Sequence, residues 1–209
     1  MTDPTDFDAT VIQDMQHWLQ QAVIGLNLCP FAKSVFARRQ IHYVVTRARD
    51  PEQLEPVLLH QLQELVGADP EVRDTTLLMV PDGLLAFRDF NDFLYRADQC
   101  LDSLSLQGTI QIASFHPNFQ FAGTGKNDIG NFTNRAPYPT LHLLRESSVD
   151  RAVAAYPQAE DIFEQNIDTL RHLGLKGWEQ MAIGRKVPLP PAAIGEPGRK
   201  APRRGTIGR

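Results

Sequence analysis

The spacing of apolar residues along the chain predicts helices alternating with strands. Between residues 10 and 26 the apolar side chains recur at the period of an amphipathic helix. Proline is favoured at the first position of a helix, so a second, short helix is predicted from Pro30 to Ala37 with Cys29 at its N-cap. The chain is therefore expected to open with an N-terminal helical segment.

Four short apolar runs predict the strands of one sheet, at residues 41–46, 75–80, 109–115 and 140–145. Further helices are predicted at residues 51–67, 90–104 and 159–173. Strands separated by helices in this way are typical of parallel neighbours joined by right-handed crossovers. We therefore predict an α/β or α+β fold, in which helices flank a four-stranded mixed or mostly parallel sheet. The direction of the fourth strand stays open.

The chain length and the distribution of charge predict one domain followed by a tail. The 209 residues suffice for one sizeable core, which we assign to residues 10–184, with 1–9 as a flexible lead-in. Residues 185–209 are rich in Pro, Gly and Arg and have few groups to bury, so a disordered basic tail is predicted. This tail carries seven Lys/Arg and one acid, which leaves the preceding body with a net charge of −10.

This composition also bears on partners and location. Phosphate contacts need a basic face, so the acidic body argues against nucleic-acid binding by the domain. No apolar run approaches the roughly 18 residues of a membrane span, and the acidic start of the chain does not resemble a targeting segment. The two cysteines, Cys29 and Cys100, fit a reducing compartment. We therefore expect a soluble cytoplasmic protein with no membrane partner; the oligomeric state stays open.

Candidate chemistry gathers around a long irregular connection, residues 117–139. Compact domains rarely keep such a segment unless it forms a lid, a binding loop or the wall of a site. His116 stands at the end of the preceding strand, where Pro117 stops the strand, and His142 lies on the strand that follows. In open α/β sheets, ligand sites lie beyond the carboxyl ends of strands. We therefore expect the site beneath this loop.

Three residues are candidates for catalysis. A thiol at a helix N-terminus has a lowered pKa, which makes Cys29 a candidate thiolate. His116 is a candidate base, and His142 is a candidate partner in the same pocket. The same three side chains form an alternative ligand set for Zn²⁺ or Fe²⁺, although their spacing matches no local metal motif. For each of them a buried structural role is the competing interpretation.

Asparagine and arginine side chains in and beside the loop are candidates for binding a substrate. Asparagine both donates and accepts hydrogen bonds, and arginine grips carboxylate or phosphate groups through paired N–H donors. The competing interpretation is that Asn and Arg form turns and internal pairs. Gly123 and Gly125 do not open a helix, so no nucleotide-binding motif is present. The candidates are Asn118, Asn131, Asn134, Arg135 and Arg145.

Three long motifs in this sequence resemble one known family. They are WLxxAVIGLNLCPFA at Trp18–Ala32, ASFHPNFQFAG at Ala113–Gly123 and NRAPYPTLHLLRE at Asn134–Glu146. The chain resembles the domain of unknown function 1415 from about residue 10 to residue 174. This resemblance implies a soluble single-domain protein and brings no established activity, substrate or cofactor.

Three functional hypotheses follow from these residues. The first is a small-molecule enzyme, a cysteine-nucleophile transferase or hydrolase in which Cys29 and His116 act on a small anionic substrate. The second is a metal-binding or metal-dependent protein that uses Cys29, His116 and His142. The third is a non-catalytic module that binds a small ligand, with Cys29 in the core.

Overall fold

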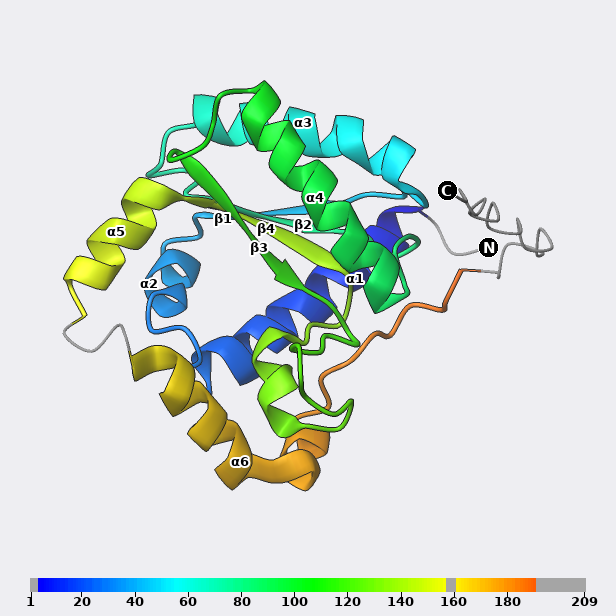
Figure 1. The fold of residues 1–209 in the computed structure, drawn as a ribbon, viewed down its shortest axis with the longest axis vertical. Coiled ribbons are helices and arrows are strands. Elements are labelled where there is room, and N and C mark those ends of the chain that lie inside the picture. The colour runs from blue at the N-terminus through cyan, green and yellow to red at the C-terminus, as the bar shows by residue number, and fades with distance from the viewer. Residues whose placement is uncertain (1–3, 157–160, 191–209) are drawn as a thin grey trace, which may run out of the picture.

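The computed structural model describes residues 4–156 and 161–190, which form a four-stranded mixed sheet with helices on both faces (Figure 1). The strands are β1 (Ile41–Val45), β2 (Thr75–Met79), β3 (Ile110–Phe115) and β4 (Thr140–Arg145). Their order across the sheet is β1-β2-β4-β3. β1 and β2 are parallel, whereas β4 runs antiparallel to both of its neighbours.

The predicted fold class is confirmed, and the structure settles the direction of the fourth strand. β4 directly follows the long connection from β3 and pairs with that strand from Ile110↔Arg145 to Phe115↔Thr140. An antiparallel return needs no crossover helix, which is why a loop alone can join these two strands. The two helical intervals before β3 do provide crossovers.

Two helices cover one face of the sheet. These are α3 (Pro51–Gly67) and α4 (Phe87–Ser103), which lie side by side above the strands in Figure 1. α3 begins at the predicted residue, where the Asp50 side chain accepts a hydrogen bond from the Gln53 N–H and Pro51 occupies the first position. Its apolar stripe is fully buried, at Leu54, Leu58, Leu62 and Leu65. Burying each such side chain contributes about 1.5–3 kcal/mol of transfer free energy.

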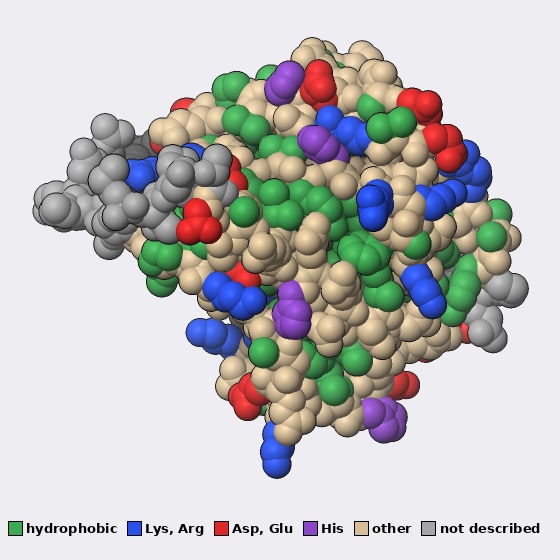
Figure 2. All heavy atoms as spheres, turned by 180° about the vertical axis from the view of Figure 1, so that it is seen from behind, with side chains coloured by type: hydrophobic (Ala, Val, Ile, Leu, Met, Phe, Trp, Pro, Cys, Tyr) green, Lys and Arg blue, Asp and Glu red, His purple; other side chains and the backbone are tan. Residues whose placement is uncertain are grey.

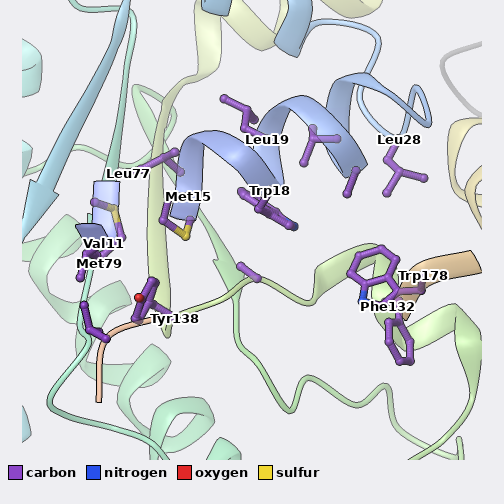
Figure 3. Close-up of a cluster of buried hydrophobic side chains, with 14 of the residues drawn as sticks. Val11, Met15, Trp18, Leu19, Leu28, Leu77, Met79, Phe132, Tyr138 and Trp178 are labelled. Carbon is purple, nitrogen blue, oxygen red and sulfur yellow. The ribbon is translucent and has the colours of Figure 1, made fainter. Parts of the chain in front are cut away.

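The opposite face packs against the N-terminal helix. α1 (Pro4–Trp18) continues directly into the π-helical turns of η1 (Leu19–Ile24), and Met15 and Trp18 point from it toward the sheet (Figure 3). The remaining elements are the short helix α2 (Ala32–Ala37), the 3₁₀ helix η2 (Ile129–Asn134), α5 (Glu146–Ala154) and the longer helix α6 (Ile162–Gln180). The ring of Phe132 in η2 meets Trp178 in α6 edge to face at 5.0 Å between centroids.

The strand β2 separates two hydrophobic cores. Leu77 and Met79 point into the core beneath α1, whereas Leu78 and Val80 point into the core beneath α3 and α4. All five residues of β2 are buried. A continuous apolar run of this kind is typical of a strand that is covered on both faces.

Several element boundaries differ from those predicted. α2 begins at Ala32 with Phe31 as its N-cap, so Cys29 lies before the helix rather than at its cap. α6 continues past Gly174, where a positive φ of 65° produces a kink, to Gln180. The start predicted for this helix, at residue 159, lies outside the described residues.

The beginning of the predicted tail packs onto the domain. Arg185 donates to the carbonyl oxygen of Pro81 at 2.6 Å, and the Lys186 N–H donates to the Asp14 carboxylate at 2.8 Å. Val187 is buried. Residues beyond the predicted boundary at 184 therefore pack onto the domain, and the rest of the predicted tail, from residue 191, lies outside the described residues.

Apolar side chains also reach the surface on the side of the molecule away from the viewer in Figure 1. Figure 2 shows them gathered near the middle of that side, with charged side chains spread mostly toward its rim. This part of the surface offers apolar contact area rather than a concentration of charge.

We expect Gly83→Ala to destabilise the protein by about 1–3 kcal/mol, because overpacking against backbone cannot relax easily. A Cβ at Gly83 would lie 2.5 Å from the Ala48 carbonyl oxygen and 2.9 Å from the Arg49 Cα. Urea unfolding measures the loss. Gly67→Ala is the matched control, since no heavy atom lies within 4 Å of its Cβ position and it ends a helix. Equal stability of the two variants would contradict the expectation.

Candidate functional site

A depression of about 600 Å³ lies beyond the carboxyl ends of the parallel strands β1 and β2. The segments that follow these strands form its walls, and each leads into a helix, α3 or α4. This is the place where open α/β sheets collect ligands. The lining residues are Arg49, Asp50, Pro51, Glu52, Asp82, Gly83, Leu84, Leu85, Ala86, Asp89, Asp92, Phe93 and Arg96.

The wall that follows β2 is held in an unusual conformation. Leu84 has a positive φ of 51°, a region that costs a side-chain-bearing residue about 1–2 kcal/mol. Next to it, Gly83 lies so close to the Ala48 carbonyl that no side chain fits. Such a conformation persists only where the surroundings hold it in place. The wall is therefore fixed by contacts with the segment after β1 and, as shown below, with His116.

The lining carries an excess of negative charge, with five carboxylates against two guanidinium groups. Some of these charges are paired within the protein. Asp82, whose side chain is 3% exposed, accepts from Arg47 Nε at 2.6 Å, and Arg96 lies 2.9 Å from Glu52. A third lining carboxylate, Asp92, lies 3.9 Å from Arg88 Nε. Asp89 is exposed and has no ion-pair or side-chain hydrogen-bond partner among the described residues. Among the five lining carboxylates, Asp89 is thus the one that has no partner within the described residues.

His116 is fully buried beside this wall, on the α4 side of the sheet. Its Nδ1 accepts a hydrogen bond from the Asn118 N–H at 3.0 Å, so the neutral ring carries its proton on Nε2 and donates to the Leu84 carbonyl oxygen at 3.1 Å. The ring packs against Phe87 and Phe90. Burial lowers the pKa of His116. Both ring nitrogens are engaged, so the imidazole is built to hold backbone in place rather than to take up protons.

The polar side chains inside the long loop hold the loop together. Asn131 is completely buried, and its Oδ1 accepts from the Phe121 N–H and the Thr124 hydroxyl, both at 2.9 Å. Its amide nitrogen donates to the Gly125 carbonyl oxygen at 2.9 Å. Arg135 donates to the carbonyl oxygens of Phe119 and Lys126. These groups replace the regular hydrogen bonding that the loop lacks.

The other predicted substrate-binding residues are also engaged within the protein. Asn134 donates to the Ser114 carbonyl oxygen at 3.3 Å. Arg145 donates to the carbonyl oxygens of Leu65 and Ala68, which lie at the C-terminal end of α3. A cation is favourable at that end of a helix dipole. Asn118 is exposed and contributes its backbone N–H to His116. Of the five predicted substrate-binding residues, Asn118 is thus the one whose side chain has no hydrogen-bond partner among the described residues.

Cys29 lies in the core beneath α1, away from His116. Its neighbours in that core include residues of η1 and α2, whereas His116 packs on the α4 side of the sheet. Hydrogen bonds from the backbone of Phe31 and Ala32 lower the pKa of the Cys29 thiol, but burial has the larger effect and raises it. The backbone N–H groups near the start of the helix thus lower the pKa as expected, and desolvation outweighs them. The geometry therefore gives a thiolate at Cys29 no support.

His142 lies on the α1 side of the sheet, in the row of residues that crosses Leu77 and Ala113. Thr75 donates its hydroxyl proton to the Leu143 carbonyl oxygen, so it accepts from His142 Nε2 at 2.7 Å. Burial lowers the pKa of His142 to about 4. His116 and His142 therefore face opposite sides of the sheet.

A family model described as "Protein of unknown function (DUF1415)" matches residues 10–180. The chain belongs to the DUF1415 family. The comparisons with curated proteins and with solved structures give no match. No helix in the described part of the chain is both long and apolar enough to cross a membrane. The family membership inferred from the three sequence motifs is confirmed, and it leaves the function to be argued from the structure.

The metal hypothesis likewise finds no geometric support in this DUF1415 chain. Within residues 4–156 and 161–190, no three His, Cys, Asp or Glu side chains are grouped so that they could hold a metal ion. Of the three residues predicted as ligands, His116 packs on the α4 side of the sheet, whereas Cys29 and His142 lie on the α1 side.

Sequence reasoning missed the acidic depression. A signal for it exists, because Pro81, Asp82 and Gly83 directly follow the buried strand β2, and Asp50 follows β1 at the equivalent point. The carboxyl ends of parallel strands meet at one edge of a sheet, so the two turns are expected to be close. The long Asn-rich loop leaves β3 at this same edge of the sheet, and its many polar residues drew the prediction away from the two turns.

We expect Asn131→Ala to lower the free energy of unfolding by about 1–3 kcal/mol, because the change leaves buried backbone and hydroxyl groups without partners. Urea denaturation provides the value. Asn127→Ala is the matched control, since Asn127 lies in the same loop, is exposed and makes no side-chain hydrogen bond to a described residue. A loss of stability as large in the control would refute the structural role of Asn131.

We expect acid to destabilise the protein through His142. In the unfolded chain this histidine titrates near its ordinary pKa of 6.5, and in the folded protein near 4. Between these values the unfolded state binds the additional proton, so stability falls as the pH falls, by at most about 1.4 kcal/mol per pH unit. His142→Gln keeps a donor for Thr75 and removes the titration. Between pH 7 and pH 4 the free energy of unfolding should therefore change less with pH in this variant than in the wild type. An equal dependence on pH in the two proteins would contradict the assignment.

Proposed function

We propose that this DUF1415 chain binds a small polar ligand that carries a cationic group, such as an amine or a guanidine. The binding site is the depression beyond the carboxyl ends of β1 and β2. The observation that carries this proposal is the lining of that depression, in which carboxylates outnumber arginines by five to two. A cation entering the depression gains attraction from the unpaired Asp89 carboxylate.

The size and the rigidity of the depression support this proposal. Its volume of about 600 Å³ is within the range of small-molecule pockets. One carboxylate, Asp82, is held by Arg47, and another, Asp50, is fixed as the cap of α3. Groups held in this way lose little freedom when a ligand binds. Leu84, Leu85 and Phe93 provide apolar contact beside them.

The expectation of an anionic ligand rested on Arg135 and Arg145, and both guanidinium groups are engaged with backbone carbonyls. The surroundings of Cys29 do not favour a reactive thiolate, because its thiol is partly buried and has a raised pKa. Of the three sequence-based hypotheses, the ligand-binding module therefore has the best support, with its site at the depression rather than beneath the loop.

The test measures binding of small cations and anions to the purified full-length protein. We expect agmatine or spermidine to bind in calorimetry and to raise the melting temperature, because a ligand that binds only the folded state stabilises it. Citrate and phosphate should do neither. Asp89→Asn should weaken binding about tenfold, a change of about 1.4 kcal/mol.

The matched control is Asp98→Asn, which removes the same charge from an exposed position on the same helix, outside the depression. It should leave the affinity for the cation within about twofold of the wild-type value, because only long-range, screened attraction is lost. Preferential binding of the anions, or equal losses in the two variants, would refute the proposed site.

A further inference from the structure

We propose that His116 is a positioning residue that couples the long loop, residues 117–139, to the wall of the depression formed by residues 82–86. This proposal rests on the proposed function in one respect only, namely that the wall binds the cationic ligand. The mechanical link itself depends on contacts of His116 alone.

On one side, the His116 ring fixes the wall. Its Nε2–H donates to the carbonyl oxygen of Leu84, the residue with the positive φ. Phe87 and Phe90, in the first turn of α4, hold the ring from the same side, with centroids 5.4 and 5.2 Å from the ring centroid. A strained residue keeps its conformation only when its surroundings determine it. The imidazole is the polar contact that holds the Leu84 carbonyl in this position.

On the other side, His116 is bonded to both ends of the loop. Nδ1 accepts from the Asn118 N–H, and the His116 carbonyl oxygen accepts from the Phe119 N–H at 3.0 Å. The His116 N–H donates to the Asn134 carbonyl oxygen at 3.1 Å. The start and the end of the loop thus meet at one residue, and that residue is also bonded to the wall.

The loop is built so that it moves as a unit. Asn131 joins Phe121, Thr124 and Gly125, and Arg135 joins Phe119 and Lys126. Disturbance at any of these points therefore reaches the loop ends that are bonded to His116. Because the ring joins these ends to Leu84, the conformation of the wall and the order of the loop depend on each other.

Two substitutions at His116 remove the two hydrogen bonds of the ring one at a time. In His116→Asn the side-chain oxygen lies where Nδ1 was, so the Asn118 contact is kept and the donor to Leu84 is lost. In His116→Gln the amide nitrogen reaches the position of Nε2, so the wall contact is kept and the Nδ1 acceptor is lost. Asn131→Ala loosens the loop at a distance from both.

The experiment follows amide hydrogen exchange in residues 82–90 of the ligand-free full-length protein. We expect Asn131→Ala to speed this exchange about tenfold in the wild-type background and to add little in the His116→Asn background, because coupled changes are not additive. His116→Gln should retain the response to Asn131→Ala. If the effects of Asn131→Ala and His116→Asn simply add, or if His116→Gln behaves like His116→Asn, the coupling is refuted.

A second measurement uses agmatine and separates this inference from the proposed function. We expect His116→Asn to weaken agmatine binding about tenfold and His116→Gln to change it less than about threefold, since a tenfold change is 1.4 kcal/mol. If agmatine binds to none of the proteins while the exchange pattern is as expected, the proposed ligand is wrong and the coupling stands. If agmatine binds equally to all three, His116 does not position the site.

Discussion

Burial of β2 on both faces is the constraint on which the rest of the structure depends. Its five residues are inaccessible, so α1 must cover one side, and α3 and α4 must cover the other. A strand buried in this way has no room for uncompensated polar groups, because each costs free energy unless it is hydrogen-bonded. Polar chemistry is therefore displaced to the connections at the ends of the strands. The acidic depression and the His116 contacts both lie in such connections.

The sequence predicts the helices and strands well, because the spacing of apolar residues agrees with the residues that mark the ends of each element. The helix predicted at residues 51–67 and the strand predicted at residues 75–80 both appear in the structure, as α3 and β2. Two features were not predictable from pattern alone. The direction of β4 depends on pairing rather than on local preference. The packing of Arg185 and Lys186 depends on partners far away in the chain, Pro81 and Asp14.

The candidate site was harder to predict than the fold. The residue types that recognise ligands are also the types that supply hydrogen bonds to backbone groups outside regular secondary structure. Asn131 and Arg135 have the donors and acceptors that a substrate site needs, yet they use them to close a loop that has little regular structure. For Cys29 the sequence suggested the helix dipole, but it does not give the burial that outweighs this effect. In each case a property of the folded environment decides between two roles that suit the residue type equally.

Polar groups that have no partner within the protein indicate a ligand site better than polar groups that have one. In the long loop, Asn131 and Arg135 have partners within the protein, and those contacts explain their presence without a ligand. In the depression, Asp89 has no such partner among the described residues, and four further carboxylates line the same surface. Surplus like charge in a concave surface opposes folding through mutual repulsion. A bound cation would relieve that repulsion, which is a physical reason to look for the ligand there.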